Sequence, residues 1–229
     1  MSPMRSVWQT LDRRLLTDAA LVCVAVGLIG LSYGATAVAV GFPLWLPVVL
    51  GALVLAAGSE FLFVGIIGAG GSPVAALLAG LLVNARHLPY GLSVPDVLGR
   101  GWRRVLGVHL MNDETVVMAI AQEEHERKRA AYWACGLGIL AIWPLSAAAG
   151  GVIGSVVPDT DALGLDAMFP AVLLALILPA LRDRTTLSSA VVGALLALAA
   201  TPFLPVGLPV LVALAGVLLS VPAARGGAA

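Results

Sequence analysis

The chain carries very little charge for its length. Of its 229 residues, 11% are charged and 60% are hydrophobic, and the mean hydropathy is +1.00. A soluble domain of this size has polar loops and half-polar helix faces, so it does not reach such values, whereas a protein that crosses a membrane several times does. The formal net charge at pH 7 is zero, and we expect the lipid bilayer, and no nucleic acid, as a partner.

Cysteine and the common enzyme motifs are also scarce or missing. The two cysteines, Cys23 and Cys135, fall within apolar runs and have neither a disulfide framework nor a metal-ligand spacing. The chain has no G-x-x-x-x-G-K-[ST] loop to hold a nucleotide, no H-E-x-x-H and no nucleophile elbow. We therefore expect no metal, no cofactor and no enzymatic activity.

Long continuous apolar runs are what the sequence has instead. The strands of a membrane β-barrel alternate apolar and polar residues over about ten positions, so the continuous runs favour helices. The predicted class is an all-α polytopic membrane protein with seven transmembrane helices. A window of about 20 residues places these spans at Asp18–Val40, Leu44–Gly68, Pro73–Val94, Ala130–Val157, Ala167–Leu181, Thr185–Thr201 and Val206–Val221.

The chain reads as a single transmembrane domain, 1–229, with one long interruption. Turn compositions separate most of the spans, and the charged connector 95–129 holds 12 of the 26 charged residues. The basic N-terminus followed by an apolar run also fits a secretory signal peptide with a cleavage site at 35–37. The further apolar spans, and a first run long enough to cross a bilayer, favour a transmembrane helix instead.

Glycine and proline mark packing and breaks within the spans. Gly27, Gly30 and Gly34 recur at helical spacing, which allows the close helix contacts that membranes require. Pro144, inside a span, predicts a kink or a break. Broken helices are where transporters place their binding sites.

A weak similarity between two stretches of the sequence suggests two repeats. The stretch at 41–57 resembles that at 164–180 in its initial Gly, its Pro six residues later and its Leu/Ala/Val run. This similarity fits two three-helix repeats, 18–94 and 130–201, followed by a last helix, 206–221. An odd number of spans in each half predicts that the halves are inverted relative to each other.

The basic residues do not fix the orientation of the chain. With seven spans, the connector 95–129 and the turn at 181–184 face one side, and the three arginines of the first 14 residues face the other. If 105–120 forms an eighth span, that grouping breaks down. Both arrangements stay open at this stage.

Polar groups at membrane depth carry the functional signal, because a charged side chain at the centre of a span costs about 2.5 to 3.5 kcal/mol on insertion scales. The first cluster is Gly58, Ser59 and Glu60, between two apolar stretches. It predicts a local unwinding that exposes backbone groups. The carboxylate of Glu60 either pairs with a basic group for structure, or binds an ammonium group or a proton.

The second cluster holds Asn84, Arg86 and His87 near the end of a span. Arg86 stays protonated, so it either snorkels to the interface or pairs with an acid, and its planar fork suits a carboxylate. We expect it in the protein interior, within ion-pair range of Glu60, Asp113 or Glu114. His87 is a candidate proton carrier, because histidine is the side-chain type that most readily exchanges a proton at physiological pH.

The third cluster, at 109–115, places Asp113 and Glu114 between apolar flanks. Asn112 or Asp113 suits the N-cap of a helix that begins at Glu114. Capping explains one acid of the pair and leaves the other without a structural role.

These stretches together resemble the AzlC family of branched-chain amino-acid exporters over nearly the whole chain. The N-x-R-H-x-x-Y and D-E-T elements are specific, and the Gly-rich ones are not. One departure is Glu60, because the family usually has Gln at that position. The matching stretches are L-A-A-G-S-E-F at 55–61, G-A-G-G-S-P at 68–73, L-L-V-N-A-R-H-L-P-Y-G-L-S at 81–93, H-L-M-N-D-E-T at 109–115, W-A-C-G-L-G at 133–138, G-G-V-I-G at 150–154 and G-L-D at 164–166.

The resemblance implies a secondary carrier in the bacterial inner membrane that exports small apolar amino acids together with a small, separately encoded AzlD-type membrane subunit. Without a nucleotide loop, an ion gradient, with the proton as the candidate ion, is the remaining energy source. The expected substrate-binding residues are Gly58, Ser59, Glu60, Asn84, Arg86, Asp113 and Glu114, with Arg86 on the substrate carboxylate. The candidate proton carriers are Glu60, His87 and Glu114.

Two other classes of function stay open. A membrane-embedded hydrolase could use Glu60, His87 and Asp113, although the known hydrolase motifs are missing. A scaffold that only assembles with a partner would need no charged groups inside its spans. Exchange of labelled leucine across vesicles separates a carrier from both.

Overall fold

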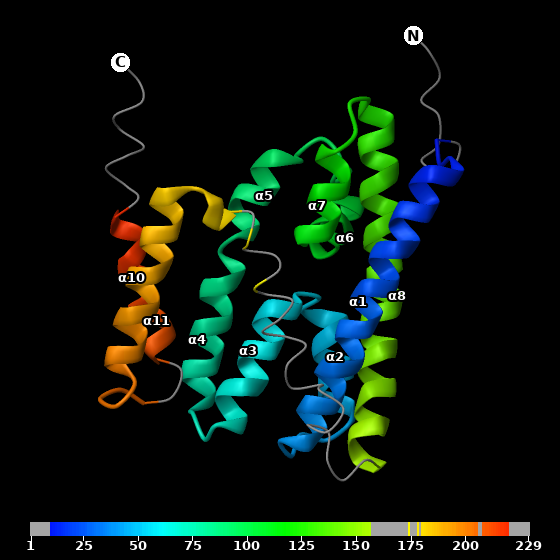
Figure 1. Ribbon diagram of the computed structural model, residues 1–229. Coiled ribbons are helices and arrows are strands. Elements are labelled where there is room, and N and C mark those ends of the chain that lie inside the picture. Colours follow the sequence, from blue (N-terminus) through cyan, green and yellow to red (C-terminus); the bar gives the residue numbers. More distant parts are fainter. Residues whose placement is uncertain (1–9, 157–173, 175–177, 179, 206–207, 220–229) are drawn as a thin grey trace, which may run out of the picture.

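The computed structural model describes residues 10–156, 174, 178, 180–205 and 208–219, and in these ranges every regular element is a helix (Figure 1). The two longest are α1 (Arg13–Ala39), with 27 residues, and α8 (His125–Val156), with 32 residues. Both are long and apolar enough to cross a membrane. The all-α class predicted from the apolar runs is confirmed for the described residues.

Helices α1 and α8 begin at the same end of the molecule and lie side by side (Figure 1). Asp12, the N-cap of α1, accepts a bond from the backbone N–H of Leu15, and its other oxygen pairs with Arg127 Nη1 of α8 at 2.7 Å. The N–H bond first, and the cation next, hold the pKa of Asp12 below its ordinary value. The ion pair ties together the starts of two parallel helices.

The α1–α8 contact is made by glycines. A Cβ at Gly34 would lie 1.9 Å from the carbonyl oxygen of Ala147, and one at Gly150 would lie 2.0 Å from that of Leu31. Because a real Cβ never approaches so closely, only glycine allows these backbones to touch. The predicted packing role of the α1 glycines is confirmed.

The apolar run 44–68 does not form one spanning helix. It forms α2 (Trp45–Leu53) and α3 (Ala57–Gly68), with 9 and 12 residues, or about 13 and 18 Å at 1.5 Å per residue. A Cβ at Gly68 would lie 2.8 Å from Cγ1 of Val40, directly after α1. Helix α2 therefore enters the helix bundle from the lower end in Figure 1, the chain turns near mid-height, and α3 returns to the lower end.

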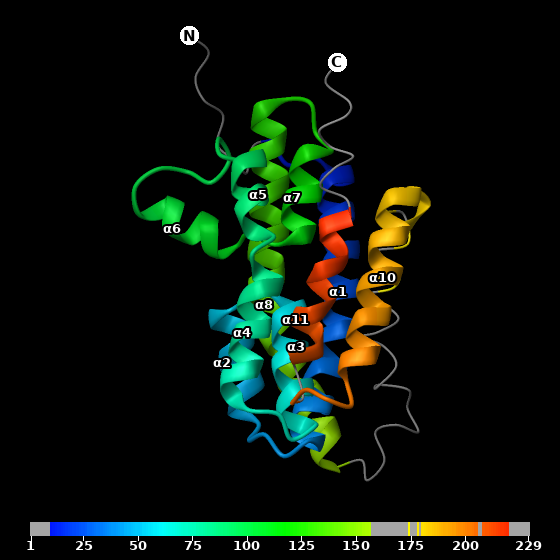
Figure 2. The same cartoon turned by 90° about the vertical axis from the view of Figure 1, so that its left-hand side faces the viewer.

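The next run, 73–93, crosses the molecule in two pieces, α4 (Pro73–Asn84) and α5 (His87–Ser93) (Figures 1 and 2). Two helices of eight residues follow, α6 (Trp102–His109) and α7 (Asp113–Ile120). They run inward from the upper end and back again, so 105–120 is not an eighth span. Two helical hairpins thus enter from opposite ends.

The C-terminal helices stand beside α4. Helix α10 (Arg184–Ala200) runs from the upper end to the lower, after the 3₁₀ turn η3 (Ala180–Arg182). Helix α11 (Leu208–Ala213), continued by η4 (Leu214–Leu219), returns to the upper end and contacts α4. Most of the span expected at Ala167–Leu181 lies outside the described residues.

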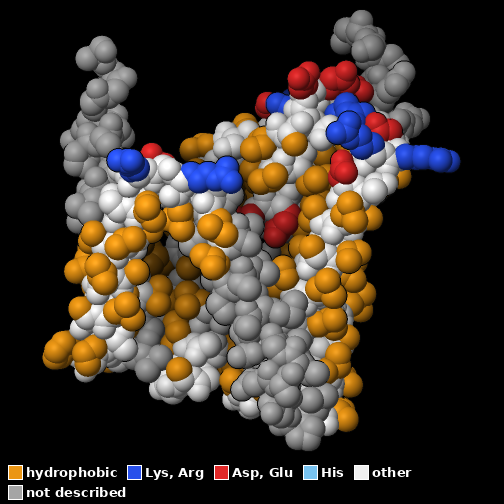
Figure 3. Space-filling model, in the orientation of Figure 1, with side chains coloured by type: hydrophobic (Ala, Val, Ile, Leu, Met, Phe, Trp, Pro, Cys, Tyr) orange, Lys and Arg blue, Asp and Glu red, His pale blue; other side chains and the backbone are white. Residues whose placement is uncertain are grey.

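Seven spans and inverted repeats are not confirmed. Because the α2–α3 hairpin turns back, the segment 18–94 crosses an even number of times, and the helices that begin the two expected repeats run parallel. Because the number of crossings is even, Arg13 and Arg14 lie at the same end as the Lys and Arg side chains of 100–104, 127–129 and 182–184 (Figure 1). Figure 3 shows these charged groups gathered at the upper end, above apolar walls.

Candidate functional site

The tip of the α2–α3 hairpin is held by a buried glutamate. Leu55 adopts a positive φ of 52°, a conformation that a branched side chain rarely takes. Glu60, which is 2% exposed, accepts the backbone N–H of Ala56 at 2.9 Å and the indole N–H of Trp143 at 3.1 and 3.2 Å. Its carboxylate thus caps α3, where the helix dipole favours negative charge.

The expected unwinding at Gly58–Glu60 is displaced in the structure. The break covers Val54 to Ala56, and the polar residues form the first turn of α3. The Ser59 hydroxyl donates to the Ala56 carbonyl at 2.9 Å, which satisfies a group at the break. Among the described residues, no cation lies within ion-pair range of Glu60, so the expected pairing of Glu60 with a basic group is not observed.

The break between α4 and α5 contains Arg86 and is followed by His87, the first residue of α5. The Nδ1 atom of His87 lies 2.9 Å from the backbone carbonyl of Asn84, which occupies one nitrogen of the ring. The His87 ring also meets Tyr90 edge to face, with centroids 5.9 Å apart. Among the described residues, no acid lies within ion-pair range of His87.

The tip of the α6–α7 hairpin is capped as the sequence predicts, with the helix starting one residue earlier. Asn112 is the N-cap, and it exchanges two 2.9 Å bonds with Thr115 in a capping box. One turn before, His109 Nε2 lies 2.9 Å from the carbonyl oxygen of Ala52, at the end of α2. This contact joins the tips of the two hairpins.

Arg86 pairs with Asp113, as predicted from the cost of an unpaired cation. Their Nη2 and Oδ2 atoms are 2.9 Å apart, and the side chains are 29% and 26% exposed, so Arg86 is partly exposed and not in the protein interior where it was expected. Tyr90 donates a short hydrogen bond to the second oxygen of Asp113. A Cβ at Gly58 would lie 3.3 Å from Arg86 Nη2, so the guanidinium reaches from α7 to the start of α3.

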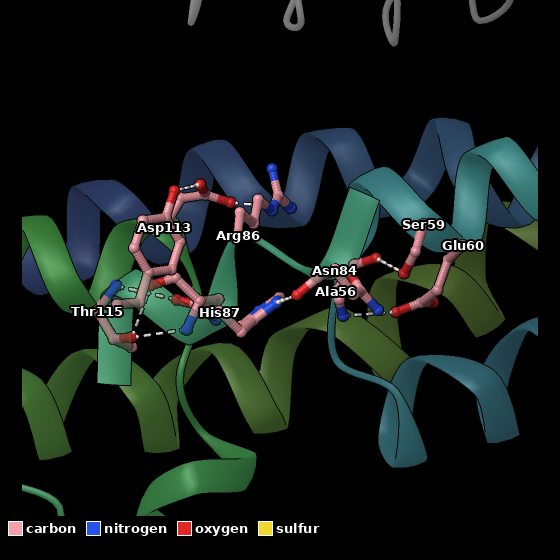
Figure 4. Close-up of polar contacts among 10 residues, drawn as sticks. Ala56, Ser59, Glu60, Asn84, Arg86, His87, Asp113 and Thr115 are labelled. Atoms are coloured by element: carbon pink, nitrogen blue, oxygen red, sulfur yellow. Dashed lines mark hydrogen bonds and ion pairs between the residues drawn. The ribbon is translucent and has the colours of Figure 1, made fainter. Parts of the chain in front are cut away.

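Asn84 connects this ion pair to a cavity. Figure 4 shows Asn84 and Arg86 between Asp113 on one side and Ser59 with Glu60 on the other. Ser59, Glu60 and Asn84 line a cavity of about 210 Å³ whose remaining walls are apolar or small residues of α2, α3 and α4. Two buried atoms in this region make no hydrogen bond in the described structure, Asn84 Oδ1 and Arg86 Nε.

The structure therefore brings most of the predicted site residues into one region. Arg86 and Asp113 form its charged part beside Gly58, and Glu114 is the next residue on α7. Residues outside the prediction also take part, because a tyrosine, a histidine and a tryptophan supply hydrogen bonds that hydropathy does not reveal. They are Tyr90, His109 and Trp143.

Comparison with known proteins links this geometry to a family. The family model described as AzlC protein matches residues 21–157. The "Branched-chain amino acid transport protein AzlC" of Bacillus subtilis is 28% identical over 150 residues, which are 64% of this chain and 58% of that protein. An "Uncharacterized membrane protein" of Haemophilus influenzae is 29% identical over 134 residues, 57% of this chain and 55% of the relative. The chain thus matches just over half of each relative, and no solved structure matches it.

Proposed function

This chain belongs to the AzlC family, and from that premise we propose that it is a secondary transporter that exports branched-chain or similar small apolar amino acids across the cell membrane. The Bacillus relative is named for branched-chain amino-acid transport. The observation that supports the proposal most is the Arg86–Asp113 pair, which lies where two helices break and beside a largely apolar cavity. A charged pair next to an apolar cavity suits a zwitterion with an apolar side chain.

In the proposed complex, Arg86 binds the substrate carboxylate. Only one contact of its guanidinium is taken up by Asp113, and the buried Nε has no partner among the residues that the structure describes, so donors remain from the five that arginine carries. Gly58 has no side chain to shield the first turn of α3, whose N–H groups favour an anion. The substrate ammonium binds among Ser59, Glu60, Asn84 and the acids of α7.

The energy source in the proposal is a proton gradient. Three titratable groups are candidates for the carrier: Glu60, which lines the cavity, Glu114, which follows Asp113, and His87, which borders the break in the crossing helix. The proposal also includes a small AzlD-type membrane subunit as partner. The exposed apolar faces of the helices are compatible with such a subunit.

We place the upper end of Figure 1 in the cytoplasm. Within the described ranges, every Lys and Arg other than Arg86 belongs to the starts of α1 and α8, to the segment 100–104 or to the segment 182–184, and these positions lie at that end (Figure 3). Short loops rich in Lys and Arg face the cytoplasm by the positive-inside rule.

Counterflow tests this function directly. Proteoliposomes that hold the chain, with and without a co-reconstituted AzlD-type subunit, are loaded with leucine and diluted into labelled leucine. A carrier accumulates label transiently, because it exchanges substrate without net flux. A hydrolase would cleave a substrate instead, and a scaffold would do neither. Absence of exchange in both preparations, with the protein inserted and monodisperse, would contradict the proposal. Full efflux by the chain alone would remove the subunit from it.

A further inference from the structure

The cavity between α2, α3 and α4 has two chemically different ends. Polar groups are confined to one end, at Ser59, Glu60 and Asn84, and the other walls are apolar or small. The apolar and small lining residues are Leu50, Val54, Phe63, Ala76, Leu77, Gly80 and Leu81.

The polar end has an acceptor without a donor. Ser59 donates its hydroxyl to Ala56, and Glu60 already accepts two N–H groups. The side-chain oxygen of Asn84 is buried and has no hydrogen bond in the described structure. Because this oxygen is buried, it does not face the cavity, so the surface that an occupant of the cavity meets is mainly apolar.

The size of the cavity fits a small side chain. Its volume of about 210 Å³ equals about seven waters at roughly 30 Å³ each, which suits a branched aliphatic side chain. Gly80 forms one wall. A Cβ built there would lie 3.6 Å from Cβ of Ser59 and 3.7 Å from its carbonyl oxygen, at ordinary contact distance, so a methyl group fits without moving the backbone and takes space from the cavity.

We infer that this cavity binds the apolar side chain of the transported amino acid, and that Gly80 sets the size of the side chain accepted. This inference rests on the proposed transport of amino acids, and it assigns specificity to residues outside the charged pair. Ala76, fully buried on the same helix one turn earlier, also lines the cavity and limits its width.

The test varies the wall and measures size preference. Gly80→Ala narrows the cavity and Ala76→Gly widens it, so the two variants are expected to shift preference in opposite directions. Gly65→Ala is the matched control, because Gly65 lies in α3 with nothing within 4 Å of a built Cβ. Each protein, purified with and without a co-expressed AzlD-type subunit, is tested for thermal stabilisation by alanine, valine, leucine and phenylalanine, and for competition by each against leucine counterflow.

One methylene in an apolar pocket changes selectivity by about 10- to 200-fold. We therefore expect Gly80→Ala to raise the half-maximal concentration of leucine about tenfold relative to that of alanine, because the narrower cavity disfavours the larger side chain. Ala76→Gly should favour phenylalanine, and Gly65→Ala should match the wild type. Folded Gly80 and Ala76 variants that keep the wild-type ranking would overturn the inference while transport stands. If the folded wild type responds to no amino acid, the proposed function fails and the inference fails with it.

Discussion

The ion pair between Arg86 and Asp113 allows a quantitative test of the site. Asp113→Asn keeps an oxygen that accepts the bond from Tyr90, but it removes the charge that neutralises Arg86. Removing one partner of a fully buried pair costs about 3 to 5 kcal/mol, and an exposed pair contributes at most about 1 kcal/mol. With the two side chains 29% and 26% exposed, we expect a loss of about 2 kcal/mol, the range of a charge-assisted hydrogen bond.

A double-mutant cycle isolates this pair from other effects. Arg86→Gln and Asp113→Asn are made singly and together, and thermal unfolding is followed in one detergent. At about 2 to 4 °C per kcal/mol for a chain of this size, each single variant should melt about 4 to 8 °C lower than the wild type. The double variant should lose clearly less than the sum, since neither charge is then left alone. Losses that add within about 0.5 kcal/mol would refute the pair as a source of stability.

Three further predictions concern the scaffold and the buried acid. Gly34→Ala should force α1 and α8 apart and greatly reduce the yield of folded protein by size-exclusion chromatography, whereas Gly65→Ala, in open space, should not. His109→Ala should remove the bond to the Ala52 carbonyl and speed amide hydrogen exchange at the tip of the α2–α3 hairpin, and His109→Gln, which can still donate, should restore protection in part. Glu60→Gln should leave leucine transport and its pH dependence unchanged, because the amide oxygen still accepts the N–H at the start of α3; a flattened pH profile would show that Glu60 carries the proton.

The pairing of Arg86 was predictable because its cause is local and large. A guanidinium cannot lose its proton, so an arginine within an apolar run needs an acid nearby, and the sequence offers few. The N-cap at Asn112 was predictable for a similar reason, since its side chain and Thr115 satisfy backbone groups three residues apart.

The hairpins were not predictable from hydropathy. A window average scores residues 44–68 as one span, because a helix that turns back inside protein is as apolar as one that crosses. The break falls at Leu55, with a positive φ and no glycine to mark it. Pro144, which did suggest a break, lies within an uninterrupted α8. The contacts that fix the tip come from distant residues, His109 and Trp143, and sequence spacing does not reveal them.

The central claim is that Arg86 binds the carboxylate of an amino acid that crosses the membrane. Leucine counterflow by the wild type, Arg86→Lys and the control Arg104→Lys tests it most directly, because lysine preserves the charge beside Asp113 but not the planar fork. Arg104 is exposed on α6, far from the proposed role. At equal insertion, the account predicts that Arg86→Lys loses most of the exchange while Arg104→Lys keeps it. Equal exchange by all three proteins would contradict the account.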